Sequence, residues 1–146
     1  MLDCLRDEVW DRPYCGAPAW QHAYHLLHSL DQWYINPERY QQPALHREGL
    51  NDLDQPAQDR LTYEELAAYL TQIAEKIRAY LAELTDDELL QKPEGCEWSR
   101  FTLMLGQLRH LSTHLGMLMG FIIDDTGKWP TVLGLTQPIG EHEKYC

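Results

Sequence analysis

Apolar residues that recur at every third or fourth position are the feature that most limits how this chain can fold. The clearest stretch runs from Thr62 to Leu84, with apolar side chains at Leu66, Leu70, Ile73, Ile77, Tyr80, Leu81 and Leu84. An α-helix turns once in about 3.6 residues, so these positions lie on one face. The stretch begins with a capping box, in which the side chains of Thr62 and Glu65 serve each other's backbone amides. We therefore predict an amphipathic helix here.

Two further segments have the same periodicity. The segment from about Ser99 to about Asp124 has apolar residues at Phe101, Met104, Leu105, Leu108, Leu111, Leu115, Leu118 and Ile122. Gly127 and Pro130 follow it and should stop the helix. The segment from about Ala19 to Asn36 carries Trp20, Tyr24, Leu27, Leu30, Trp33, Tyr34 and Ile35, and Pro37 ends it. We predict a helix in each.

The rest of the chain is predicted to connect these helices. Residues 36–60 contain three prolines and read as a long loop, of a kind that is often functional. Residues 85–90 are typical of a one-turn helix, and residues 1–10 could form a fourth, short helix. No alternating run of β-branched residues predicts a strand. The sequence thus favours a single all-α domain over residues 1–146, arranged as a small antiparallel bundle.

The charge balance and the apolar runs exclude several classes of protein. With 12 Lys and Arg against 23 Asp and Glu, the net charge is −11, which disfavours nucleic-acid binding. No apolar run approaches the roughly 20 residues that cross a bilayer, so we expect no membrane partner. No secretory signal is visible after Met1, and the expected location is the cytoplasm.

Histidine is the residue type that points to chemistry. His110 and His114 are four residues apart, which stacks their imidazoles on one helix face, about one turn apart. Two such nitrogens can chelate one metal ion. A third ligand from the helix that carries His28 would give a three-histidine site with open positions, as in catalytic metal centres. The alternative for His28 is a core histidine that hydrogen-bonds a backbone carbonyl or a tyrosine.

Two stretches resemble the DinB-like (YfiT-like) metalloenzyme superfamily. Trp20, His28 and Asp31 resemble its Trp…His-x-x-Asp stretch, and the segment Leu108 to Gly116 resembles its His-x-x-x-His signature followed by Gly. The resemblance covers about residues 1–125 and implies a four-helix bundle. It also implies a divalent metal ion bound by His28, His110 and His114, with His25 as the substitute for His28 if that helix is aligned one turn off.

The resemblance further implies an activity on a small molecule. Members include thiol S-transferases that use low-molecular-weight thiols and a hydrolase-like group. Zinc and nickel are the metals most often implied, and three imidazoles would also accept iron or manganese. Asp31 is the best candidate for a catalytic proton acceptor. The preferred alternative is that Asp31 accepts a hydrogen bond from the free N–H of a ligand imidazole and so fixes its tautomer. A metal-free interaction bundle and a metal sensor or store remain the competing functions.

One departure from the family pattern predicts a partner. The family's first helix is usually long, but only about ten residues precede Trp10 in this sequence. A short first helix would leave part of the apolar face of the other helices uncovered. We therefore expect a homodimer with a largely apolar interface.

Overall fold

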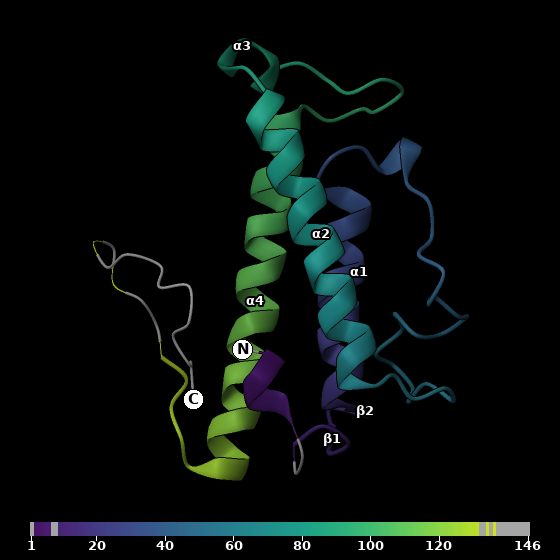
Figure 1. The fold of residues 1–146 in the computed structure, drawn as a ribbon, viewed down its shortest axis with the longest axis vertical. Coiled ribbons are helices and arrows are strands. Elements are labelled where there is room, and N and C mark those ends of the chain that lie inside the picture. The colour runs from purple at the N-terminus through teal and green to yellow at the C-terminus, as the bar shows by residue number, and fades with distance from the viewer. Residues whose placement is uncertain (1, 7–8, 132–133, 135, 137–146) are drawn as a thin grey trace.

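The computed structural model describes residues 2–6, 9–131, 134 and 136, and this part of the chain is mostly helical (Figure 1). Its long helices are α1 (Ala19–Trp33), α2 (Tyr63–Glu83) and α4 (Arg100–Thr126), and a one-turn helix, α3 (Asp86–Leu89), precedes α4. Short 3-10 turns occupy Leu2–Leu5 and Pro37–Arg39. The predictions of a mostly helical chain and of its three long helices are confirmed, with boundaries within three residues of the predicted ones.

The segment before α1 differs from the prediction. The helix expected over residues 1–10 is a single 3-10 turn, Leu2–Leu5, and residues 1, 7 and 8 lie outside the described part. A small antiparallel hairpin follows, made of β1 (Pro13–Tyr14) and β2 (Ala17–Pro18). Cys15 and Gly16 make its turn with positive φ angles of 50° and 95°. Strands of two residues are too short to show an alternating pattern, which is why the sequence did not predict them.

The helix directions follow from the connections. α1 and α2 run in the same direction, joined by the long connection over residues 34–62, whereas α4 runs back against both (Figure 1). Ring contacts confirm the antiparallel pairing of α1 and α4. Tyr14, just before α1, stacks on Phe121 near the end of α4, and Trp33 at the end of α1 meets Trp98 just before α4. An antiparallel four-helix bundle is therefore not confirmed, because α1 and α2 are parallel and the N-terminal element is one turn.

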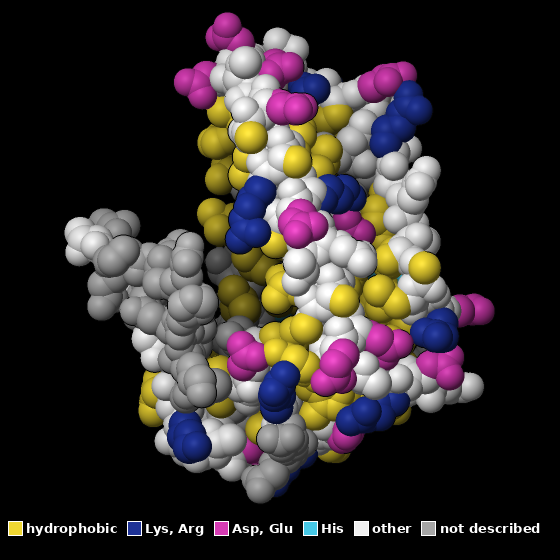
Figure 2. Space-filling model, in the orientation of Figure 1, with side chains coloured by type: hydrophobic (Ala, Val, Ile, Leu, Met, Phe, Trp, Pro, Cys, Tyr) yellow, Lys and Arg dark blue, Asp and Glu magenta, His cyan; other side chains and the backbone are white. Residues whose placement is uncertain are grey.

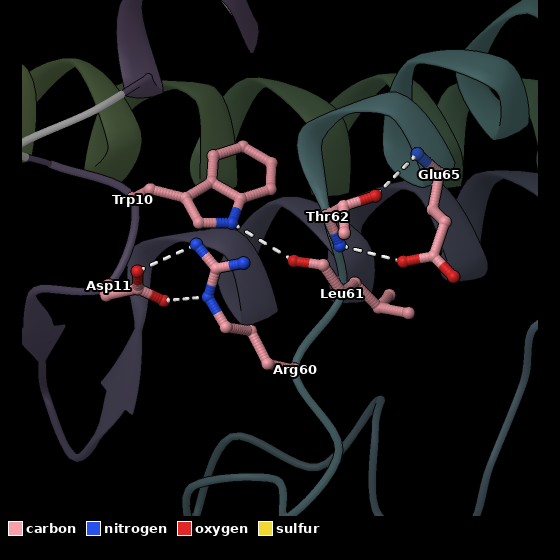
Figure 3. A network of polar contacts seen from close by, with 6 residues as sticks. All are labelled: Trp10, Asp11, Arg60, Leu61, Thr62 and Glu65. Carbon is pink, nitrogen blue, oxygen red and sulfur yellow. Dashed lines mark hydrogen bonds and ion pairs between the residues drawn. The ribbon is translucent and has the colours of Figure 1, made fainter.

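A hydrogen-bond network fixes the N-terminal segment to the start of α2 (Figure 3). The Trp10 indole N–H donates to the Leu61 carbonyl at 3.1 Å, and Arg60 makes two hydrogen bonds with Asp11 at 2.6 and 2.8 Å. The predicted capping box is present, since the Glu65 amide donates to Thr62 Oγ1 at 3.2 Å and the Thr62 amide to Glu65 Oε2 at 2.8 Å. The start of α2 is thereby held beside the start of α1.

The core lies between α1, α2 and the second half of α4. It is built mainly from large side chains that are at most 3% exposed, among them Leu5, Trp10, Trp20, Tyr24, Leu66, Tyr69, Ile73, Leu118 and Ile122. The first half of α4 differs, because Phe101, Leu105 and Leu108 are 45–58% exposed. Figure 2 shows this part of the surface as a column of apolar side chains along the edge of the molecule that α4 forms. Among the described residues, no helix is long and apolar enough to cross a membrane.

Candidate metal centre

Three histidines from two helices converge where α1 packs against α4. His25 of α1 meets His110 and His114, which lie one turn apart on α4. Each offers one ligand atom, and these three atoms all lie within 4.8 Å of one another. The ring centroids are 4.4 to 5.3 Å apart. Antiparallel packing of two helices thus joins a predicted pair to a histidine about 85 residues earlier in the chain.

His28, the predicted third ligand, lies elsewhere. It is 4% exposed, its Nε2 lies 2.9 Å from Gln42 Oε1, and its ring stacks on His46 at 4.9 Å. Three residues along a helix turn the side chain by about 60° away from His25, toward residues 40–46 of the long connection. The structure therefore groups His25, the substitute considered from the sequence, with His110 and His114. His28 has a buried, hydrogen-bonded position, as in its alternative, but its partner is the Gln42 side chain and not a backbone carbonyl or a tyrosine.

Asp31 is also placed apart from the three histidines. Its carboxylate accepts a hydrogen bond from the Tyr69 hydroxyl at 3.0 Å and pairs with Lys76 at 2.6 Å. Both partners belong to α2, and six residues separate Asp31 from His25, which is about 120° around α1. These contacts make Asp31 a link between α1 and α2. The role of catalytic proton acceptor stays a prediction with no contact in the described site to support it.

The protonation of His25 follows from its partners. Its Nδ1 lies 2.8 Å from the backbone carbonyl of Asn51, which can only accept a hydrogen bond. Nδ1 must therefore carry the proton, and Nε2 of the neutral ring has a free lone pair. That Nε2 lies 3.3 Å from His110 Nε2. A protonated Nδ1 held by a carbonyl and a bare Nε2 turned toward other imidazoles is the arrangement that metal-binding histidines adopt.

The two histidines of α4 are held in their neutral form. Burial, together with repulsion from the neighbouring His110, His25 and His22, lowers the pKa of His114 to about 4. Burial likewise lowers the pKa of His110, with added repulsion from His25 and Arg109. Neutral imidazole is the form that binds a metal ion. Nδ1 of His110 and of His114 are buried without a hydrogen-bond partner in the described structure, so the polar groups of these two rings are not all satisfied within the protein. Three imidazoles that are not closed into a hydrogen-bond network are a donor set that fits a divalent ion.

Comparison with known proteins agrees with this geometry. The model of the DinB superfamily matches residues 1–118. The chain belongs to the DinB superfamily. The matched range includes His25, His110 and His114, so the whole histidine group lies in the part of the chain that the DinB superfamily shares. No curated protein and no solved structure matches this DinB-superfamily chain.

Sequence reasoning missed two partners of the site. One is the Asn51 carbonyl, a backbone group in a long loop, which no side-chain pattern could have indicated. The other is Gln21, which is fully buried and contacts the same loop. The sequence did contain an indication of Gln21, because this residue lies one turn before His25 on the same helix face.

Proposed function

We propose that this DinB-superfamily protein is a metal-dependent enzyme that acts on a small molecule, with His25, His110 and His114 as the metal ligands. The observation that carries the proposal is the group of three imidazole ligand atoms that lie within 4.8 Å of one another. Three protein ligands leave positions open for water or substrate, as in catalytic zinc sites. Zinc or nickel is the proposed ion, and iron or manganese would suit the same ligands.

The chemistry proposed is transfer of a low-molecular-weight thiol, with hydrolysis as the alternative. A bound divalent ion acts as a Lewis acid that favours thiolate over thiol, or hydroxide over water, at neutral pH. The chain's own groups hold the site in shape: the Asn51 carbonyl keeps the proton on Nδ1 of His25, and burial keeps His114 neutral. In the transfer reaction the thiol loses its proton to solvent, and its sulfur bonds to an electrophilic carbon as a leaving group departs.

The test is a paired assay of metal-loaded and metal-free protein. Glutathione, cysteine and other small thiols are offered with electrophiles such as aryl halides, and ester and amide substrates are assayed in parallel. We expect turnover that requires the metal and that falls to background in His114→Gln. Stoichiometric metal binding without turnover on any substrate class would contradict the enzyme and would leave a metal-binding bundle without catalysis.

We further propose that a second copy of the chain covers the exposed apolar face of α4. Phe101, Leu105 and Leu108 recur at spacings of four and three and are 45–58% exposed. The helix has no acidic residue between Arg100 and Ile123, although the chain contains 23 acidic residues. A chain with a charge of −11 repels its own copies, and this stretch of α4 adds no acidic side chain to that repulsion. A symmetric dimer through α4 would cover it.

A further inference from the structure

The buried side chain of Gln21 holds the loop that orients His25. Gln21 is 0% exposed, and its amide nitrogen donates to the backbone carbonyls of Asp52, Gln55 at 3.1 Å and Gly49 at 3.4 Å. Its amide oxygen accepts from the Ala57 backbone N–H at 2.8 Å. The two amide hydrogens are shared among three carbonyls, so one side chain binds four backbone groups of the segment over residues 49–57. This segment has no helix or strand of its own.

Asn51 lies in the middle of the segment that Gln21 holds. Its carbonyl accepts the Nδ1 proton of His25 at 2.8 Å, and His25 follows Gln21 by one helical turn. The two α1 side chains therefore bind the same loop from adjacent positions of one helix face. Leu50, which is 1% exposed, fixes the segment to the core independently of Gln21. Removing the Gln21 amide should consequently loosen the carbonyl position without releasing the whole loop.

We propose that Gln21 is a positioning residue of the metal centre, which fixes the Asn51 carbonyl and thereby the tautomer and ring orientation of His25. Outer partners of ligand histidines typically change metal affinity by about 10–100-fold when they are lost. Gln21 acts one step further out, through the backbone of residues 49–57. The metal part of this proposal rests on the proposed function, whereas the tautomer part concerns the metal-free chain.

The test compares Gln21→Met with Gln107→Met. Both glutamines are buried, at 0% and 8% exposed, but the side-chain hydrogen bond of Gln107 is with Ser29 of α1, not with the loop. Zinc affinity is measured by competition with a chromophoric chelator, and folding is monitored by thermal unfolding. We expect Gln21→Met to bind zinc about 10-fold more weakly or worse, and Gln107→Met to bind as the wild type does. Equal affinity in the wild type and Gln21→Met would overturn the proposal.

A second measurement does not depend on metal binding, and its wild-type arm does not depend on how well a variant folds. Long-range ¹⁵N–¹H correlation spectra of metal-free protein report which ring nitrogen of His25 carries the proton. We expect the Nδ1–H tautomer in the wild type and a mixture of tautomers in Gln21→Met. The Nε2–H tautomer in the wild type would overturn the positioning role. If the wild type binds no zinc but the wild type and Gln21→Met show the expected tautomers, the proposed function fails and the positioning of His25 by Gln21 and Asn51 stands. The Nδ1–H tautomer undiminished in folded Gln21→Met would overturn the role of Gln21.

Discussion

Replacing His25 with Gln is expected to abolish tight binding of a divalent ion, whereas the same replacement of His28 is expected to leave it intact. His25 supplies one of three ligand atoms, and two imidazoles on one helix chelate a metal weakly without a third. The loss should exceed the roughly 10–100-fold that removal of an outer partner costs. Metal content after reconstitution and dialysis, together with a zinc affinity from chelator competition, measures the effect.

The two variants form a matched pair. Both histidines belong to α1, and each has one ring nitrogen near an oxygen acceptor, Asn51 O for His25 and Gln42 Oε1 for His28. Since His28 is buried, His28→Gln should lower the melting temperature, and this cost in stability is recorded alongside the affinity. The opposite result would be metal binding that survives in His25→Gln but disappears in folded His28→Gln. It would show that the third ligand is His28, as the sequence resemblance implied, and not His25.

Replacing Leu108 with Glu is expected to convert a dimer into a monomer. Leu108 is 58% exposed on the face of α4 that we assign to self-association. Because a two-fold interface brings the same face of both copies together, one substitution introduces two carboxylates into an apolar contact. Light scattering at micromolar concentration should give twice 17.1 kDa for the wild type and 17.1 kDa for the variant. A monomeric wild type would contradict the dimer.

Leu90→Glu is the control for this prediction. Leu90 is 77% exposed at the end of α3, outside α4, and the substitution changes the net charge by the same amount. The control should remain a dimer. If it dissociates as readily as Leu108→Glu, the added charge and not the α4 face determines the oligomeric state, and the interface lies elsewhere.

Local signals in the sequence were sufficient for the helices but not for their arrangement. The Thr62–Glu65 capping box and Ser99, whose hydroxyl accepts from the Thr102 amide, are interactions between residues three apart, so composition and spacing reveal them. The shared direction of α1 and α2 depends on the path of a long connection, which contains several prolines and no periodicity. That path is set by tertiary contacts such as those of Gln21, which spacing along the chain does not encode.

The candidate site, like the fold, could be predicted only where its geometry is fixed within one helix. His110 and His114 could be paired because their relation is fixed by one helix. Choosing between His25 and His28 required the rotation of α1 about its own axis, which depends on packing against α4 and on residues 40–57 of the connection. Asp31 was assigned to the site from its distance along the chain to His28, whereas its partners are on α2.

The most direct test of the metal centre is anomalous scattering from crystals of the wild-type protein grown with zinc. Data collected above and below the zinc absorption edge locate the ion without assuming its ligands. We predict one strong peak within about 2.0–2.2 Å of ring nitrogens of His25, His110 and His114. A peak between His28 and His46, or no peak at the three histidines in protein that retains stoichiometric zinc, would contradict the assignment.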